Sequence, residues 1–187
     1  MSFLVLIGIL IVIALWVVSV YNGLVTAQVQ TKEAWSTVDV QLKRRYDLIP
    51  NLVETVKGYA KHESKTLENV INARNMAMSI NGSSVQKEQH ENMLSGALKS
   101  IFALTESYPD LKANQNFLDL QARIADTEDK IQAARQYYNT AVMSLNRKIR
   151  VFPSNIIANR FGITEEHFFE LEEAEKAAVK VAPKVQF

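Results

Sequence analysis

The sequence predicts an all-α protein with one N-terminal transmembrane helix, followed by an elongated, antiparallel, up-and-down helical bundle. Three observations support this fold class. The chain begins with a long apolar segment, and its first charged side chain is Lys32. Beyond that segment, apolar residues recur every three or four positions, which is the spacing of one helix face. Only four Pro and six Gly occur in 187 residues, so a turn-rich β domain is not expected.

The first element is an apolar segment that covers residues 3–20. At 1.5 Å per residue it is about 27 Å long, close to the thickness of a bilayer core. Trp16 and Tyr21 lie near its C-terminal edge, where amphipathic rings favour the headgroup level. The alternatives are a cleaved signal peptide, with small residues for cleavage at 25–27, and a buried core helix. For a signal peptide the start lacks a basic residue and the apolar run is too long, and a core helix this apolar on all faces would need a larger protein around it. We therefore expect residues 1–21 to be an uncleaved anchor that enters the lipid bilayer through residues 3–21.

The orientation of this anchor is predicted from the charges on its two sides. No Lys or Arg precedes the apolar segment, whereas Lys32 and the basic cluster at 43–45 follow it. Because cytoplasmic flanks are enriched in Lys and Arg, the N-terminus is expected outside and the C-terminal domain in the cytoplasm.

The second region, residues 22–163, is expected to form the bundle. Its clearest apolar stripe runs from Phe117 to Leu145 in alternating steps of three and four for four heptads. Short connections between long amphipathic segments predict antiparallel neighbours. The expected helices lie near 24–48, 50–79, 85–107 and 114–150, with a short helical turn near 156–160.

Two boundaries need separate treatment. Pro50 is either a kink within a long helix or a corner between two helices, and because Pro suits a first helical turn we expect a new helix to start there. The tail at 164–187 is acidic, with six Glu and three Lys. Thr164 followed by Glu165 and Glu166 resembles a helix N-terminus, where acidic groups meet the positive end of the helix dipole.

The sequence carries no pattern that marks a reaction. It has no cysteine, which excludes thiolate metal sites and Cys nucleophiles. Its histidines have no metal-ligand spacing, and neither a phosphate-binding glycine loop nor a nucleophile elbow is present. A net charge of +1 gives no general attraction to nucleic acid. We expect a protein that is not an enzyme, with no cofactor, no metal ion and no nucleic-acid partner. The three histidines are His62, His90 and His167.

Polar residues on the apolar stripes are candidates for a structural role. Arg45 lies on a stripe and in the basic cluster at 43–45, which could instead bind anionic lipid. The cluster is about 30 Å or more from the membrane, far beyond a Debye length of about 8 Å, so an inward Arg paired with a carboxylate is preferred. Glu128 and Asp47 are the possible partners, and such a pair would specify helix register more than stability. The candidates for the polar core are Arg45, Asp47, Glu128, Arg135 and Asn139; Asn146 and Asn155 are further candidates for core or capping hydrogen bonds.

Several blocks of the sequence together resemble a known family. The longest block runs from Val40 to Val53 and follows Ala34-Trp35. These blocks resemble the LemA family of bacterial proteins, from about Asn22 to the C-terminus. The further matching blocks are Glu54–Tyr59, Ala73-Arg74, Tyr108–Asn114, Asn116-Phe117, Glu128, Ala134-Arg135, Tyr138-Asn139, Asn146, Phe152–Asn155 and Pro183–Phe187.

The resemblance implies a small protein of the bacterial cytoplasmic (inner) membrane, with a single N-terminal span and an antiparallel helical bundle. It implies no reaction, because the family has no established biochemical activity. Relatives are associated with membrane-bound compartments in magnetic bacteria, and family genes often neighbour membrane proteases.

Three hypotheses for function remain open at this point. The first is a membrane-anchored, non-enzymatic scaffold that forms homo-oligomers. The second is an adaptor or accessory subunit for another membrane protein, such as a protease, which binds through aromatic residues of the tail. The third is a hydrolase with an unrecognised site. The aromatic and apolar residues of the second hypothesis are Phe161, Phe168, Phe169 and Leu171.

Overall fold

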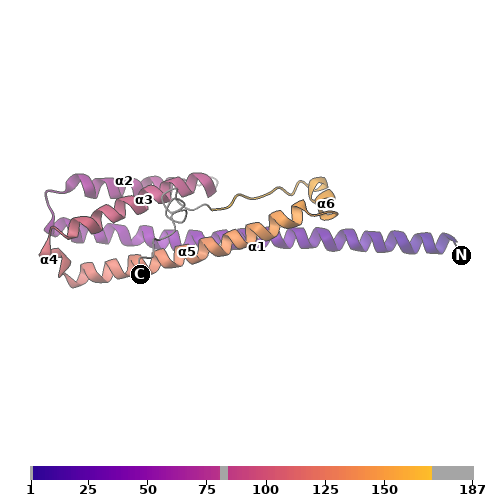
Figure 1. Cartoon of the computed structure of the whole chain (residues 1–187), viewed down its shortest axis with the longest axis horizontal. Coiled ribbons are helices and arrows are strands. Elements are labelled where there is room, and N and C mark those ends of the chain that lie inside the picture. Colours follow the sequence, from indigo (N-terminus) through magenta and orange to yellow (C-terminus); the bar gives the residue numbers. More distant parts are fainter. Residues whose placement is uncertain (1, 81–83, 170–187) are drawn as a thin grey trace, which may run out of the picture. The chain divides into compact units, whose positions relative to one another are not determined.

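The regular structure of the chain is helical throughout the described residues. The computed structural model describes residues 2–80 and 84–169, within which no strand occurs (Figure 1). This confirms the all-α class, while the elongated bundle stays a prediction. The helices are α1 (Ser2–Tyr59), α2 (Ser64–Ser79), α3 (Ser84–Thr105), α4 (Pro109–Lys112), α5 (Gln115–Arg150) and α6 (Ser154–Arg160).

Internal contacts divide the described chain into two units. The anchor unit contains residues 2–41 and 130–168. The network unit contains residues 42–80, 84–129 and 169. Both α1 and α5 contribute residues to each unit.

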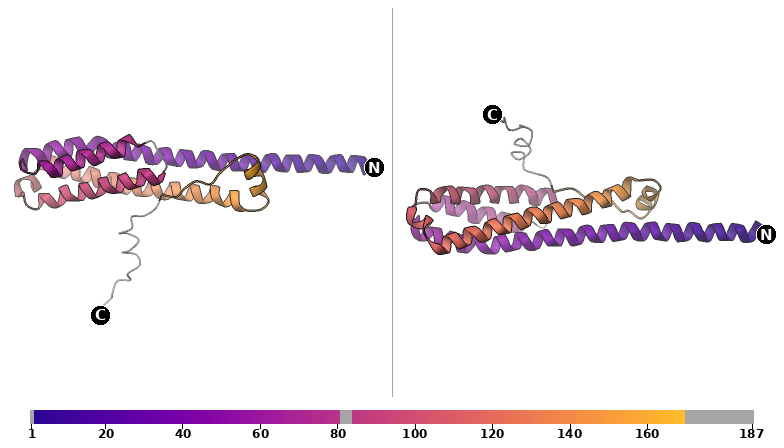
Figure 2. Two further views of the ribbon diagram at one scale, coloured as in Figure 1. Left: turned by 90° about the horizontal axis from the view of Figure 1, so that it is seen from above. Right: turned by 60° about the horizontal axis from the view of Figure 1, so that its bottom comes forward.

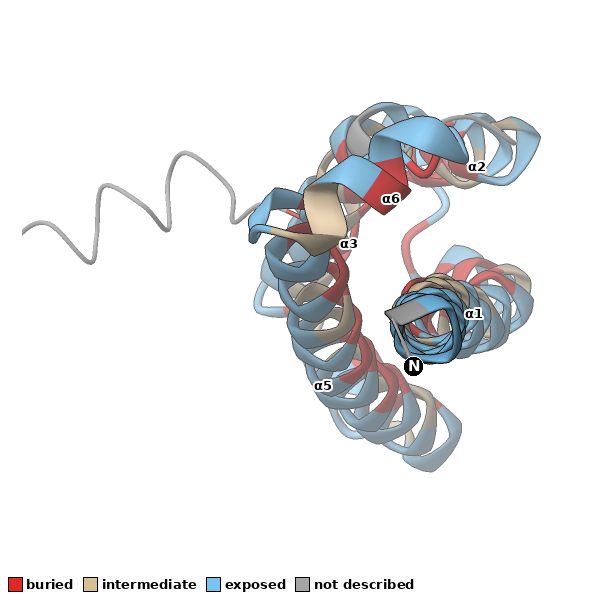
Figure 3. Cartoon of the chain, turned by 90° about the vertical axis from the view of Figure 1, so that its right-hand side faces the viewer, coloured by how far each residue is buried: buried red, intermediate tan, exposed pale blue. Residues whose placement is uncertain are grey.

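The N-terminal part of α1 is exposed on all sides. Every side chain from Phe3 to Trp16 is exposed, as the end-on view of this helix in Figure 3 shows. Within the described residues α1 is the one helix long and apolar enough to cross a membrane. A helix that is apolar all round needs an apolar environment, and no protein covers this part of α1. These are the properties of a membrane anchor.

The core of the anchor unit begins directly after this exposed part of α1. Leu24 and Ala27 of α1 are buried, and Trp35 of α1 meets Tyr138 of α5 with ring centroids 5.1 Å apart. Helix α5 carries its buried residues on one side and its exposed residues on the other (Figure 3). The cluster at one end of the unit consists of Leu24, Ala27, Leu145, Ile149, Ile157, Ala158 and Ile163, with half-buried Val17, Val20 and Tyr21 packed against it.

The network unit is built from one segment each of α1 and α5 together with α2, α3 and α4. Helices α2 and α3 lie side by side (Figures 1 and 2). Phe102 of α3 and Phe117 of α5 meet edge to face, with ring centroids 6.5 Å apart. In this unit α1, α2, α3 and α5 each carry a largely buried stripe of apolar residues at helical spacing. Their fully buried members include Leu42, Ile49, Val56, Val70, Leu94 and Ile101.

Pro50 does not begin a helix, so the predicted boundary at this residue is wrong. Helix α1 continues through Pro50 and ends at Tyr59. Proline has no N–H to donate to the carbonyl of Tyr46, four residues earlier. The Nε of Arg74 on α2 donates to that carbonyl at 2.8 Å and takes the place of the missing donor. The helix is instead interrupted at residues 60–63, just after Gly58. Glycine has the lowest helix propensity after proline.

The other predicted helices agree with the structure to within two residues at each end, apart from the merged α1 and the shortened α2. The short helix α4 was not predicted. The expected helix N-terminus at Thr164 is also wrong for the described residues, because residues 163–169 have no regular secondary structure. Side chains of α5 bind this segment in a non-helical conformation. The acidic tail from residue 170 onward lies outside the described residues.

Candidate functional site

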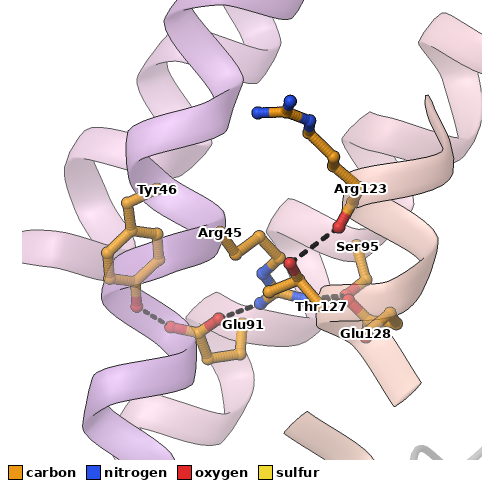
Figure 4. A network of polar contacts seen from close by, with 7 residues as sticks. All are labelled: Arg45, Tyr46, Glu91, Ser95, Arg123, Thr127 and Glu128. Atoms are coloured by element: carbon orange, nitrogen blue, oxygen red, sulfur yellow. Dashed lines mark hydrogen bonds and ion pairs between the residues drawn. The ribbon is translucent and has the colours of Figure 1, made fainter. Parts of the chain in front are cut away.

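A buried charge network in the network unit is the most distinctive polar feature of the described residues (Figure 4). Its centre is Arg45 on α1, whose side chain is completely buried. The Nη1 of Arg45 donates to Oε2 of Glu128 on α5 at 2.5 Å and to Oγ of Ser95 on α3 at 3.2 Å. Its Nη2 donates to the carboxylate of Glu91 on α3. One guanidinium therefore connects three helices.

Glu91 is the second buried member of the network, and its side chain is also completely inaccessible. Its Oε2 accepts from Arg45, and its Oε1 accepts from the hydroxyl of Tyr46 (Figure 4). Both oxygens of the buried carboxylate are thus hydrogen-bonded, as burial of a charge requires. Glu128 lies at the edge of the network, with 44% of its side chain exposed.

The charge on Arg45 is maintained by its carboxylate partners. Burial by itself lowers the pKa of the guanidinium, but the neighbouring carboxylates of Glu128 and Glu91 and their hydrogen bonds raise it. The result is a pKa above the ordinary value of arginine. Arg45 is consequently a permanent buried cation, and its place in the core depends on these acidic partners.

The spacing of the sequence brings these side chains together. Arg45 lies between Leu42 and Ile49 on the buried face of α1. Glu91 lies three residues before Leu94 on the buried face of α3. Residues three or four positions apart share a helix face, so each charged group is directed into the core with its apolar neighbours.

Glu91 was not among the sequence-based candidates. Leu94, Leu98 and Ile101 form an apolar stripe on α3, and one step of three from Leu94 toward the N-terminus reaches Glu91. A charged residue in phase with an apolar stripe was the signal that identified Arg45. The same signal, applied to the start of α3, identifies its buried partner.

The remaining candidates for the polar core lie elsewhere. Asp47 is exposed, so it is not a core residue: two positions along a helix turn the side chain by about 200° away from Arg45. Arg135 and Asn139 are half-buried on α5 in the anchor unit, which does not contain Arg45. Of the further candidates, Asn146 is buried. Asn155 is half-buried on α6.

Asn146 joins α5 to the segment that follows α6. Its Nδ2 donates to the carbonyl of Glu166 at 2.8 Å, and its Oδ1 accepts from the N–H of Glu166 at 3.0 Å. The hydroxyl of Tyr138 donates to the carbonyl of His167 at 3.0 Å. Arg150 forms an ion pair with Glu165 at 2.5 Å, which raises the pKa of Arg150 and lowers that of Glu165. These contacts replace the hydrogen bonds that a helix would provide.

No metal-binding cluster is found in the part of the chain that the structure describes. Among residues 2–80 and 84–169, no group of three or more His, Asp and Glu side chains is placed to hold a metal ion. His62 and His167 are exposed, and His90 is half-buried. An open groove of about 320 Å³ on the anchor unit is lined mainly by apolar atoms. Its residues are Met143, Asn146, Arg147, Arg150, Val151 and Phe168.

The fold and the network together define the class of protein. It is an all-α protein whose first helix has the properties of a membrane anchor and whose buried charges bind one another. This class agrees with the comparisons with known proteins.

The chain belongs to the LemA family, whose model matches residues 34–187. It is 29% identical over 161 residues to Protein LemA of Metamycoplasma hominis, which covers 84% of this chain and 72% of that protein. It is 22% identical over 175 residues to Magnetosome protein MamQ 2 of Paramagnetospirillum magneticum, and 20% over 174 residues to Magnetosome protein MamQ of Magnetospirillum gryphiswaldense. These two matches cover 80% of this chain and 64% of each relative, slightly less than two thirds of their length. None of these names refers to a catalytic activity.

Proposed function

We propose that the protein is a membrane-anchored, non-enzymatic scaffold that associates with copies of itself. The observation that carries this proposal is the continuity of α1 from the exposed apolar segment to the packed residues Leu24 and Ala27. A helix without an intervening loop transmits the position of the membrane span directly to the rest of the anchor unit. Such a rigid connection suits a protein that holds a surface at a fixed place beside a membrane.

The chemistry of the charge network supports a structural role. Arg45 and Glu91 are inaccessible and donate to or accept from neighbouring side chains. A catalytic group must reach a substrate, and these two side chains have no path to one. Buried ion pairs of this kind are best known for fixing the register and arrangement of helices.

Self-association is supported by apolar side chains on the outward face of α1. Val29 and Val40 lie 11 positions apart, about three helical turns, and therefore on the same side of the helix. They are 47% and 59% exposed. Both lie in the part of α1 that follows the apolar segment, where the membrane would already align two copies in parallel.

Cross-linking in intact membranes tests this interface. The chain has no cysteine, so Val29→Cys and Val40→Cys each introduce a single thiol. We expect each variant to form a covalent dimer on mild oxidation, whereas Thr140→Cys on the exposed side of α5 stays monomeric. If neither valine position cross-links more than the Thr140 control, α1 is not the interface.

A second candidate function is an adaptor for another membrane protein. Phe161 and Phe168 are exposed, which keeps this candidate open, whereas Phe169 is buried and is not available to a partner. Leu171 lies outside the described residues. A chain lacking residues 170–187 retains the contacts of Asn146 and Arg150, so loss of a captured partner on this deletion would favour the adaptor. Retained capture by the truncated chain would remove the tail as the binding segment.

We propose that the protein lies in the bacterial cytoplasmic membrane with its N-terminus outside. The relatives named as magnetosome proteins support a membrane role in general. Modification of Val40→Cys by a membrane-impermeant maleimide tests the orientation: labelling only after the cells are opened is expected, and labelling of intact spheroplasts would reverse it.

A further inference from the structure

The corner between α5 and α6 lies beside the C-terminal end of the apolar segment of α1. Buried Ile157, Ala158 and Ile163 belong to the cluster against which Val17, Val20 and Tyr21 pack. The rings of Tyr21 and Phe161 are 4.6 Å apart between centroids. Lys148 Nζ donates to the carbonyl of Gly23 at 3.1 Å. If residues 3–21 span a bilayer, this corner must lie at the level of its surface.

The outward side of this corner is apolar. Phe152 is 74% exposed, Ile156 59% and Phe161 54%. Val151 is also exposed. These four large apolar side chains are exposed within 11 residues, a local concentration that in soluble proteins marks an interaction surface. Their position next to the membrane span identifies the adjacent apolar phase as the lipid.

Within residues 147–163 all charged side chains are basic, and the nearest acidic side chain in sequence, Glu165, is paired with Arg150. Residues 147–163 contain four basic side chains and no Asp or Glu. Long cationic side chains beside buried apolar groups can extend to the phosphate level of a bilayer. Cations within a Debye length of the surface are attracted to anionic headgroups. The four basic residues are Arg147, Lys148, Arg150 and Arg160, all of which are exposed.

We propose that residues 147–161 form an interfacial element that enters the surface of an anionic phospholipid bilayer. Phe152, Ile156 and Phe161 lie at the boundary between headgroups and acyl chains, about 5–10 Å deep. Arg147 and Arg160 contact lipid phosphates. This second attachment fixes how far α1 enters the membrane and how it is rotated about its axis. The proposal rests on the membrane anchor and is independent of self-association.

Site-directed spin labelling of the full chain tests the proposal. Single cysteines at Phe152 and Ile156 would carry a nitroxide in vesicles of phosphatidylcholine mixed with phosphatidylglycerol. We expect both labels to be accessible to oxygen and protected from a water-soluble nickel reagent. Ala133→Cys, on the exposed side of α5, is the matched water-exposed control, and Leu10→Cys is the matched lipid-exposed control.

The outcomes separate the possible explanations. Labels at Phe152 and Ile156 that behave like the one at Ala133 would overturn the proposal, provided that the label at Leu10 is in lipid. A label at Leu10 in water would overturn the anchor as well. Broadening of the Phe152 signal by a nitroxide on a second copy would show that another copy of the chain, and not lipid, covers Phe152. This result would also overturn the proposal.

The cationic residues have their own test. Arg147→Gln with Arg160→Gln should reduce protection of the Phe152 label in vesicles containing phosphatidylglycerol, and change it little in phosphatidylcholine alone. Circular dichroism verifies that the helices of this variant remain formed. Unchanged protection in the anionic vesicles would contradict the role of the two arginines.

Discussion

Arg74 and Pro50 depend on each other at the scale of single residues, because the guanidinium donates to the carbonyl that Pro50 leaves without a donor. Arg74→Met should therefore lower the free energy of unfolding by about 1.5–3 kcal/mol, the range for a hydrogen bond to a charged group. In a Pro50→Ala background the backbone N–H returns, so the same substitution should cost less. The four proteins of this cycle are the natural sequence, Arg74→Met, Pro50→Ala and the double variant. Their thermal unfolding, followed by circular dichroism, gives the coupling free energy between Arg74 and Pro50. An equal cost in both backgrounds would show that Arg74 acts through other contacts.

Glu91 and Glu128 should contribute unequally to the charge network. Glu91→Gln leaves a buried cation without its buried partner, and we expect a loss of about 3–5 kcal/mol. Glu128 is partly exposed, so Glu128→Gln should cost about 1 kcal/mol or less. Both values come from the same unfolding measurement. A larger loss for Glu128→Gln would mean that the exposed carboxylate, and not the buried one, holds Arg45 in the core.

At the scale of the elements, the segment after α6 should depend on one side chain. Asn146→Ala removes both hydrogen bonds to the backbone of Glu166. We expect faster amide hydrogen exchange in residues 163–168, with little change in α2 and α3. Ser144→Ala, on the exposed side of the same helix, is the control. Unchanged exchange of the segment would show that it is held by its apolar contacts alone.

The same segment should respond to acid. The hydrogen bond from Arg150 lowers the pKa of Glu165 below its ordinary value of 4.5. A lowered pKa in the folded state means that the stabilisation is fully present above the ordinary value and is lost as the pH falls through the lowered one. The protection factors of the amides in residues 163–168, which correct for the intrinsic pH dependence of exchange, should fall over this acidic range. They should fall more than those of Glu165→Gln measured under the same conditions. A parallel pH dependence in both proteins would exclude the ion pair as the cause.

The helices could be predicted from sequence where the information is local. The stripe from Phe117 to Leu145 determines one long helix, and the helix is present. The failures depend on contacts distant in the chain. Where α1 continues through Pro50, the open carbonyl of Tyr46 accepts from Arg74, 28 residues away, and the non-helical segment near Glu166 is bound by Asn146, 20 residues away. Neither contact can be predicted from the sequence until it is known which segments are neighbours in the fold.

The polar network could be predicted in part, because the helical phase of each residue is local information in the sequence. The position of Arg45 on an apolar stripe indicates an inward cation, and the position of Glu128 beside the stripe from Phe117 to Leu145 makes it a possible partner. The choice between Asp47 and Glu128 follows from helical phase, because Asp47 is turned to the exposed side of α1. Glu91 required the stripe of α3 to be extended toward its N-terminus.

At the scale of the whole molecule, the proposed scaffold requires that the anchored protein assembles with copies of itself. The chain has a continuous first helix, exposed valines along it, and buried charges that bind one another. These features support a scaffold, and an isolated copy would not form one. The size of the solubilised protein is therefore the decisive property.

The most direct measurement is the mass of the full-length protein, extracted in mild detergent and determined by light scattering over a range of protein concentrations. A self-associating scaffold should be a discrete oligomer, and Val40→Glu should shift it toward the monomer by placing charge on the exposed face of α1. A strictly monomeric mass at the highest concentration, in several mild detergents, would contradict the scaffold.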